Sequence, residues 1–415
     1  MLEPPPVVLD IYDKLERAGY DTWCVGGAVR DALLGLPNAD WDLATAATPQ
    51  EVMRLFRRHV PLGVEHGTVG VLDRHNVPHE VTTFRRDVET DGRHAVVKFG
   101  ATLDEDLARR DFTINAIAYK PRSDEIRDPF DGRADLARGI VRAVGNPADR
   151  MREDRLRALR AIRFAARFEF DIDPATWTAI VASVPDLPRL SVERITQEIE
   201  KTMEQVRRPS LAFTRWRSSG ALATLIPALA SVDDITIASL DCLPLPSGPR
   251  ADPRQANRLA ALFLTAKGDV NLSLKKQRMK WIEALAESWS RLGPTITGDA
   301  NPAQIRRWVS SIGRLNTDPF FRIAAARWTA ARTFAPPIIR SLYGRAVRAA
   351  FRNPVEIGDL AIDGNDLNKL VAIPPGPGMR KILEGLLDYV LADPVRNTRD
   401  SLLMHARQLH ERFPF

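Results

Sequence analysis

One stretch of sequence decides the fold: residues 25–35 read VGGAVRDALLG, and residues 40–45 read DWDLAT. The residues before it, 21–25, form an apolar run with β-branched and aromatic side chains, which predicts a strand. Gly26 and Gly27 end this strand, because glycine adopts unusual backbone angles without a steric penalty. The stretch therefore predicts a strand that stops at a sharp glycine turn.

A helix is predicted directly after the turn, over residues 28–34, with Gly35 as its end. Backbone N–H groups at the start of such a helix have no partner within the helix and attract anions. Arg30 lies in the first turn and can add charge-assisted hydrogen bonds to the same anion. We therefore expect a phosphate-binding turn here.

Asp40 and Asp42 come next, two residues apart. Residues at this spacing point to one face of a strand, where two carboxylates repel each other unless a cation lies between them. Mg²⁺ takes oxygen ligands and keeps substrate phosphates in its shell, which suits metal-assisted displacement at phosphorus. A polar turn with two solvated aspartates would have the same short pattern, but the glycine turn upstream favours a metal site.

The composition bounds the class of protein. The chain has 415 residues, enough for two to four domains, with 44% hydrophobic and 27% charged residues, as in soluble globular proteins. The net charge of +6 suits a polyanionic partner such as RNA. No apolar run is long enough to span a bilayer, and no obligate protein partner is evident. With only Cys24 and Cys242, a disulfide framework is not expected, and a reducing cytoplasm is the expected location.

These two segments resemble the class II tRNA nucleotidyltransferase and bacterial poly(A) polymerase family, which includes the CCA-adding enzymes. The resemblance implies an α+β fold: an N-terminal nucleotidyltransferase (polymerase-β-like) head with a mixed β-sheet, followed by an all-α neck, body and tail. The implied boundaries are 1–146 for the head, 147–204 for the neck, 205–355 for the body and 356–415 for the tail. It also implies that Asp40 and Asp42 are catalytic and hold Mg²⁺, and that Gly26, Gly27 and Arg30 bind the nucleotide.

Residues 109–116, RRDFTINA, resemble a second motif of the family. Arg110 can hold phosphate bidentately and Asp111 can accept a ribose hydroxyl, and the resemblance implies these roles. Asn115 is a further candidate in the same segment. The pattern at 61–69, PLGVEHGTV, is more similar to CCA-adding enzymes than to poly(A) polymerases.

Residues 151–168 predict one long helix that carries a repeat of polar residues at every third position, Asp154, Arg157, Arg160 and Arg163. A solvated face with an ion pair would show the same periodicity. The segment resembles the family motif Glu-Asp-x-x-Arg, in which protein side chains replace a nucleic acid template. There Asp154 would accept from the amine of cytosine or adenine and Arg157 would donate to the base, while Arg160 and Arg163 bind the triphosphate or brace Arg157.

The sequence suggests a structure or a contact for each of three further segments. Residues 85–94 are polar and predict either an irregular mobile loop beside the site or a plain hairpin tip. Arg194, near the start of a helix that Ser191 can cap, can reach a phosphate or a neighbouring carboxylate. The basic runs at 275–281 and 306–308 are either RNA contacts or solvated faces.

The resemblance implies template-independent addition of C, C and A to the 3′ end of tRNA from CTP and ATP. The alternatives are a poly(A) polymerase of the same family, a partial enzyme that adds only CC or only A, and a non-catalytic RNA-binding protein. Both aspartates are present, which disfavours the last alternative.

Overall fold

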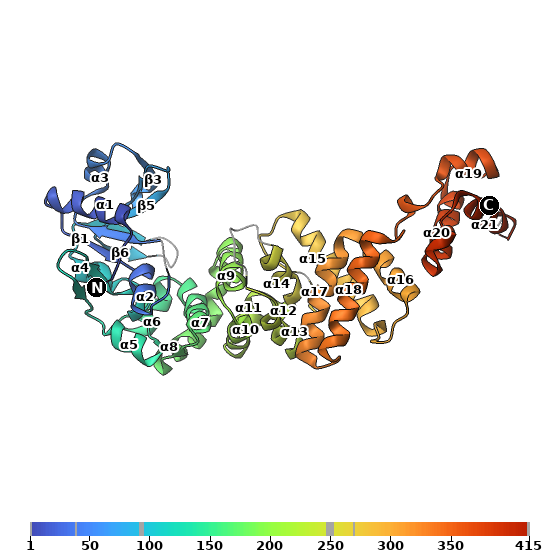
Figure 1. Cartoon of the computed structure of the whole chain (residues 1–415). Coiled ribbons are helices and arrows are strands. Elements are labelled where there is room, and N and C mark those ends of the chain that lie inside the picture. The colour runs from blue at the N-terminus through green and yellow to red at the C-terminus, as the bar shows by residue number, and fades with distance from the viewer. Residues whose placement is uncertain (1, 38–39, 91–94, 246–252, 269, 413–415) are drawn as a thin grey trace. The chain divides into compact units, whose positions relative to one another are not determined.

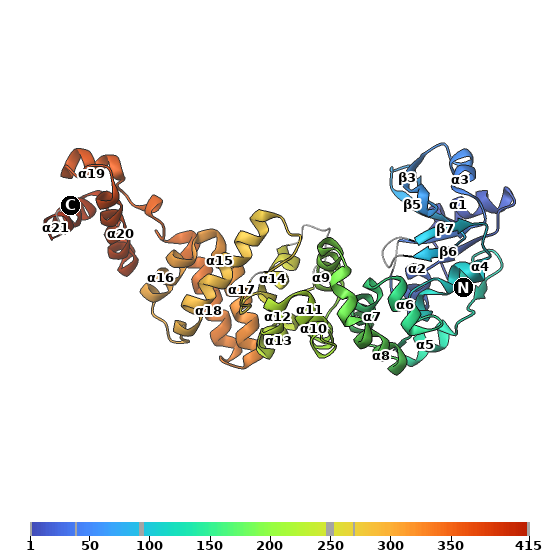
Figure 2. The same ribbon diagram turned by 180° about the vertical axis from the view of Figure 1, so that it is seen from behind.

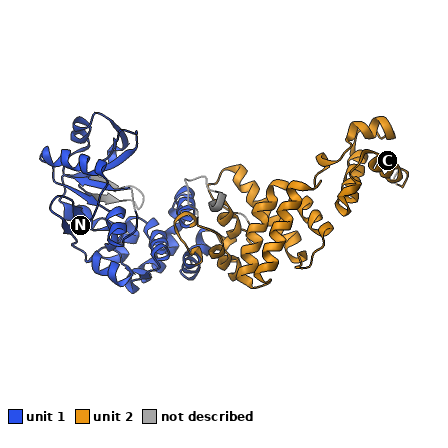
Figure 3. Ribbon diagram, viewed as in Figure 1, with its two compact units in different colours: residues 1–202, 211–225 blue, residues 203–210, 226–415 orange. Residues whose placement is uncertain are grey.

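The structure is a computed structural model that describes residues 2–37, 40–90, 95–245, 253–268 and 270–412. The chain forms two compact units: residues 1–202 with 211–225, and residues 203–210 with 226–415 (Figure 3). The division into four domains, with ends at 146, 204 and 355, stays a prediction. No helix of the described residues is long and apolar enough to cross a bilayer.

The first unit is built on a mixed seven-stranded sheet (Figures 1 and 2), which confirms the predicted kind of head. In spatial order its strands are β3 (His59–Gly63), β4 (Thr68–Leu72), β5 (Pro78–Thr83), β2 (Asp42–Thr45), β1 (Thr22–Val25), β8 (Ala118–Lys120) and β9 (Glu125–Arg127). The central strand β2 pairs antiparallel with β1 and parallel with β5. The predicted strand before the glycine turn is β1, and the predicted helix after it is α2 (Gly27–Leu33).

Local capping chemistry explains where several helices start. Helix α3 (Pro49–Leu55) begins after Thr48, whose side chain accepts from the Glu51 backbone while the Glu51 side chain accepts in return, a capping box. Helix α4 (Leu103–Ala108) has the same arrangement between Thr102 and Glu105. The other helices of the first unit are α1 (Pro6–Arg17), α5 (Gly132–Arg138), α6 (Pro147–Glu153), α7 (Leu156–Phe168), α8 (Pro174–Ser183), α9 (Val192–Gln205, which ends in the second unit) and α11 (Ala221–Leu225).

Three expectations about this unit need correction. Residues 85–90 are not irregular: β6 (Arg85–Thr90) pairs with β7 (Ala95–Phe99) as a two-stranded hairpin, whose tip at 91–94 lies outside the described residues. The neck is not wholly helical, because β10 (Ile140–Val141) pairs with β11 (Asp171–Ile172). The predicted helix 151–168 is interrupted at Asp154, between α6 and α7.

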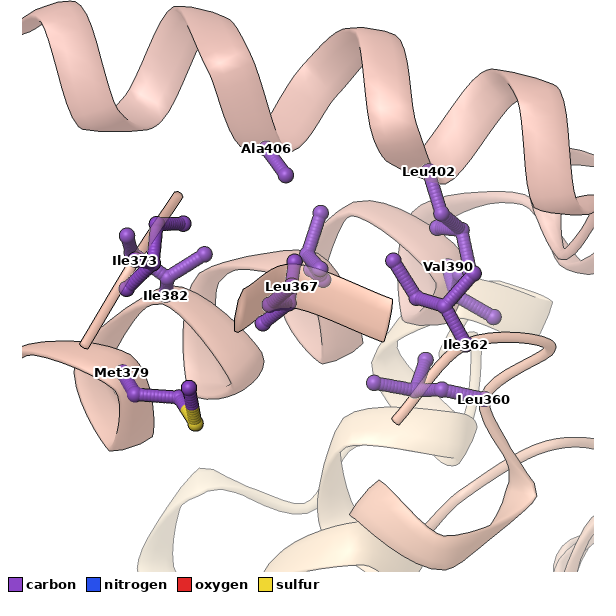
Figure 4. Close-up of a cluster of buried hydrophobic side chains, with 10 residues drawn as sticks. Leu360, Ile362, Leu367, Ile373, Met379, Ile382, Val390, Leu402 and Ala406 are labelled. Carbon is purple, nitrogen blue, oxygen red and sulfur yellow. The ribbon is translucent and has the colours of Figure 1, made fainter. Parts of the chain in front are cut away.

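The second unit is helical throughout its described residues. Its helices are α12 (Pro227–Ala230), α13 (Asp234–Ser239), α14 (Pro253–Leu262), α15 (Lys276–Leu292), α16 (Pro302–Ile312), α17 (Arg314–Ala331), α18 (Pro336–Arg352), α19 (Gly364–Val371), α20 (Pro377–Ala392) and α21 (Arg399–Arg412), and α10 (Pro209–Ser218) starts in it. The last three helices have a core of their own, in which Leu367, Val390 and Leu402 point toward one another (Figure 4). The tail as a separate domain, residues 356–415, stays a prediction.

Candidate active site

The glycine turn brings two predicted site residues together. Gly26 has φ 77° and ψ −137°, a conformation that L side chains rarely adopt. A Cβ atom on Gly26 would lie 3.2 Å from Nη1 of Arg110 and 3.8 Å from Oδ2 of Asp42. Gly26, Arg110 and Asp42 therefore lie close together, and their role as one site stays a prediction.

Asp42, beside this turn, interacts electrostatically with two further carboxylates, Glu80 and Asp40. Asp42 is the first residue of β2, and Glu80 lies on β5, the parallel neighbour in which Val81 pairs with Leu43. Burial, with the charges of Glu80 and Asp40, raises the pKa of Asp42 to about 7, although Arg110 acts in the opposite direction. Burial and Asp40 also raise the pKa of Glu80. The surroundings of Asp42 and Glu80 therefore disfavour the negative charge of these two groups.

Two details differ from the sequence-based expectation. Asp40 is exposed and precedes β2, so the alternation of a strand does not explain its position beside Asp42. Glu80 was missed altogether, because the link between residues 42 and 80 comes from the pairing of β2 with β5 and not from spacing along the chain. Its one local signal is an acidic side chain directly before the β-branched run 81–83.

The carboxylates suit a hard divalent cation that is completed by the substrate. No group of three or more His, Cys, Asp or Glu side chains within the described residues is arranged to hold a metal by itself. Mg²⁺ commonly binds through one or two carboxylates, with water and substrate phosphates as its other ligands. A cation beside Asp42 would offset the repulsion that raises its pKa. The residues present therefore fit a metal that is shared between protein and nucleotide.

Arg30 lies in a different environment from the one expected for a phosphate ligand. Its side chain is 3% exposed, its Nε donates to Asp31 at 2.7 Å, and its Nη1 donates to Asn115 at 2.5 Å. The guanidinium also lies 4.7 Å from the ring centroid of Phe168 on α7. This geometry disagrees with a direct phosphate contact, because every donor nitrogen already faces a protein group. Arg30 instead joins α2 to the helix that follows the head.

Asp111 is held from two sides. Its Oδ1 accepts from Nδ2 of Asn115 at 2.9 Å, and its Oδ2 accepts from Nη2 of Arg160 at 2.7 Å. Burial acts to raise the pKa of Asp111, but Arg160 and Asn115 outweigh it, and the pKa lies below its usual range. The structure therefore brings Asp111, Asn115 and Arg160 together, and it keeps Asp111 negatively charged.

The motif that resembles a protein template lies at the break between α6 and α7. Arg157 is 11% exposed, and its Nη1 donates to Oε2 of Glu153 at 2.8 Å while its Nη2 donates to the carbonyl of Arg109 at 2.8 Å. The second bond connects α7 to the segment that carries Arg110. In a continuous helix, the side chain of Asp154 could pair with that of Arg157. It does not do so here, because the φ of −145° at Asp154 takes the chain out of the helix.

Arg194 is the partner that holds Asp154. Its Nη2 donates to both carboxylate oxygens at 2.9 Å, and the backbone N–H of Leu156 donates to Oδ1 at 3.0 Å. Of the two options left open by the sequence, Arg194 therefore reaches the carboxylate. Arg163, in contrast, is 3% exposed and donates to Glu198 of α9 at 2.7 Å. This position favours bracing of the helices over contact with a triphosphate.

We expect Arg194→Ala to lower the preference for CTP and ATP over UTP and GTP about tenfold, since it removes charge-assisted bonds that orient Asp154. The measurement is the ratio of kcat/KM values for the four nucleotides. Arg194→Lys should recover part of the preference. Arg189→Ala, which removes an exposed ion pair with Asp186, is the control. An unchanged preference in Arg194→Ala would contradict a positioning role.

A mixed sheet with a glycine turn beside clustered carboxylates, joined to helices that carry Asp154 and Arg157, defines a nucleotidyltransferase. The chain matches the family "Poly A polymerase head domain" over residues 22–142, and "Probable RNA and SrmB- binding site of polymerase A" over residues 169–232. The CCA-adding enzyme of Geobacillus stearothermophilus is 32% identical, with 97% of this chain and 96% of the relative aligned. That of Limosilactobacillus fermentum is 34% identical over 96% of each chain.

Solved structures show the same fold. The Bacillus stearothermophilus CCA-adding enzyme in complex with CTP superposes with a TM-score of 0.75 at 29% identity, covering 99% of this chain and 100% of that chain. The Thermotoga maritima enzyme complexed with tRNA_CCA has a TM-score of 0.67 at 21% identity, covering 97% and 95%, a likeness of fold alone. The chain belongs to the CCA-adding enzyme family, and membership of this family implies the use of a divalent metal ion.

Proposed function

We propose that this protein adds C, C and A to the 3′ end of tRNA, using CTP and ATP and releasing pyrophosphate. The observation that carries the proposal is the grouping of Asp42, Asp40 and Glu80 beside Gly26 and Arg110. Related enzymes that bear the name CCA-adding enzyme align over nearly the whole chain, which supports the choice of reaction.

In this proposal, different residues of the first unit bind the triphosphate and the metal ion. Gly26 and Gly27 let the triphosphate approach the backbone, and Arg110 neutralises part of its charge. Asp40 and Asp42, with Glu80 beside them, would hold Mg²⁺, which supplies charge neutralisation at the reacting phosphate when bound. The terminal 3′-hydroxyl of the RNA attacks the α-phosphate, and pyrophosphate leaves.

The base is selected by Asp154 and Arg157. A carboxylate accepts from the amino group of cytosine or adenine and offers no donor to uracil or guanine oxygen at the same place. Arg194 and Glu153 hold these two side chains, so the selecting groups are arranged before a nucleotide binds. Asp111 and Arg160 are proposed to contact the nucleotide from the adjacent segment, and Arg163 and Asn115 to support them.

Because the pKa of Asp42 is raised, we expect the affinity for Mg²⁺ to depend on pH. Because that pKa is about 7, a proton competes with the metal below neutral pH. The apparent affinity for Mg²⁺ should rise by up to about tenfold per pH unit from pH 6 to 7 and level off above it. Calorimetric titration at pH 6, 7 and 8 measures this. A flat profile would contradict it, and Asp42→Asn should remove the pH dependence.

The same shift has a consequence for the stability of the metal-free protein. Between the ordinary pKa of an aspartate and about 7, the unfolded chain releases the Asp42 proton while the folded chain keeps it. The contribution of Asp42 to the free energy of unfolding therefore falls as pH rises through this window. Added Mg²⁺ should restore it, since the cation binds the ionised form.

The decisive experiment measures incorporation of labelled CTP and ATP, singly and mixed, into tRNA transcripts that end before CCA, after C and after CC. Addition of CCA followed by a stop is the expected result. A long ladder from ATP alone would indicate a poly(A) polymerase, and use of ATP only on the CC-ended transcript would indicate an A-adding enzyme. Either of these results would overturn the proposal.

The four domains inferred from the sequence remain part of the proposal: head 1–146, neck 147–204, body 205–355 and tail 356–415. The core shared by α19, α20 and α21 supports a separate tail. β10, within residues 1–146, pairs in parallel with β11, within residues 147–204.

A further inference from the structure

The arginine beside the glycine turn is held by a buried carboxylate, Asp106 of α4, whose side chain is 1% exposed. Its Oδ2 accepts from Nη2 of Arg110 at 3.1 Å. Its Oδ1 accepts from Nε of Arg109 at 3.0 Å and from the backbone N–H of Arg85 at 3.4 Å. Burial acts to raise the pKa of Asp106, but the charges of Arg110 and Arg109 outweigh it, and the pKa lies below its usual range. Asp106 therefore stays negatively charged beside both guanidinium groups.

The contact with Asp106 leaves the other terminal nitrogen of Arg110 beside the turn. Nη1 of Arg110 lies 3.2 Å from the place that a Cβ atom on Gly26 would occupy. The hydrogen bond from Nη1 to the carbonyl of Asn115 is long, at 3.5 Å, so Nη1 is well placed to meet an anion at the turn. Arg109 and Arg110 share one carboxylate, so these three side chains keep a positive charge for that anion.

The end of α4 is also fixed through its backbone. Carbonyl groups at the end of a helix have no partner within the helix. Here Nη1 of Arg150 donates to the carbonyl of Ala108 at 3.0 Å, and Nη2 of Arg157 donates to the carbonyl of Arg109 at 2.8 Å. Because Arg157 is bound through a backbone carbonyl, its contact with α4 does not require the carboxylate of Asp106.

We propose that Asp106 is a positioning residue for nucleotide binding, which directs Arg110 toward the triphosphate. A charge-assisted hydrogen bond fixes the direction of a guanidinium group, and an arginine that is already oriented loses less conformational freedom when phosphate binds. All four nucleotides carry the same triphosphate, so Asp106 affects their affinities equally and leaves selection of the base to Asp154 and Arg157. That Arg110 contacts a triphosphate rests on the proposed function.

The test is equilibrium binding of CTP and of pyrophosphate to the full chain, with Mg²⁺ and without RNA. Asp106→Asn should weaken the binding of both about tenfold, because an amide accepts through one oxygen only and without charge assistance. The ratio of kcat/KM values for CTP and UTP on a tRNA transcript that ends before CCA should stay unchanged. Asp104→Asn is the matched control: it makes the same change on the same helix, at an exposed carboxylate that pairs with Arg127, and should change none of these quantities.

A second pair of variants guards against a loss of folding. Asp106→Asn leaves two guanidinium groups without their shared charge, so thermal unfolding without nucleotide is measured alongside. Asp106→Asn/Arg109→Gln removes one charge of each sign and restores the balance of the wild type. Compared with Arg109→Gln alone, the double variant lacks only the carboxylate that orients Arg110, and it should bind pyrophosphate several times more weakly.

Unchanged or tighter binding of pyrophosphate in both comparisons would overturn the inference, since Asp106 would then only neutralise Arg110. A fall in base selectivity as large as the fall in affinity would also overturn it, because Asp106 would then support the end of α4 as a whole. If the wild-type chain binds CTP and pyrophosphate as expected but does not add CCA, the proposed function fails and the inference about Asp106 stands. If it adds CCA while Asp106→Asn binds both probes normally, only the inference fails.

Discussion

Asp42→Asn is expected to reduce nucleotide addition by at least about a thousandfold, because it removes a metal-holding charge that is worth several kcal/mol in the transition state. Asparagine keeps the size of the side chain at the start of β2. It also removes a charge that burial, Glu80 and Asp40 all disfavour, so the fold should be retained. Single-turnover incorporation of labelled CTP into a tRNA transcript measures the rate.

The stability of this variant separates chemistry from folding. Without metal at pH 8, Asp42→Asn should unfold at the same temperature as the wild type or higher, since repulsion within the carboxylate cluster is relieved. Asp10→Asn, at an exposed position of α1, is the control and should keep full activity. Wild-type turnover by Asp42→Asn would refute the role of Asp42 in holding the metal.

Arg157→Ala is expected to have the second largest effect, a loss of selectivity for CTP and ATP of about a hundredfold against UTP and GTP. A good bidentate contact between a side chain and a base is worth about 1–3 kcal/mol of discrimination, and the upper part of this range corresponds to that factor. The structure supports a large effect, because Glu153 and the Arg109 carbonyl hold the guanidinium in one position. Single-nucleotide kcat/KM values measure the selectivity.

The control for Arg157 is Arg152, on the preceding helix α6. Arg152 is exposed and pairs with Asp149 at the surface of α6, so Arg152→Ala should leave selectivity unchanged. Arg157→Lys should keep the charge but lose the planar fork, and it should therefore recover only part of the selectivity. Equal selectivity in Arg157→Ala and the wild type would mean that other groups read the base.

Local sequence was sufficient for much of the head. The strand before Gly26 and the helix after it are present as predicted, because each depends on residues within one or two turns of one another. The family resemblance implies a helical second half, and the described residues of the second unit confirm it. Family membership follows from short motifs, and the comparisons over the whole chain confirm it.

Only the tertiary structure decided which groups meet. The sequence by itself determined the two aspartates, the glycine turn and the presence of Asp154 and Arg157, because those are local patterns. The pairing of β2 with β5 brings Glu80 near Asp42. Because the helix is interrupted at Asp154, the carboxylate of Asp154 binds Arg194. Arg30 of α2 is buried against α7. The physical reason is that burial and electrostatic partnership depend on residues that lie far apart in the chain, and spacing along the chain does not encode such contacts.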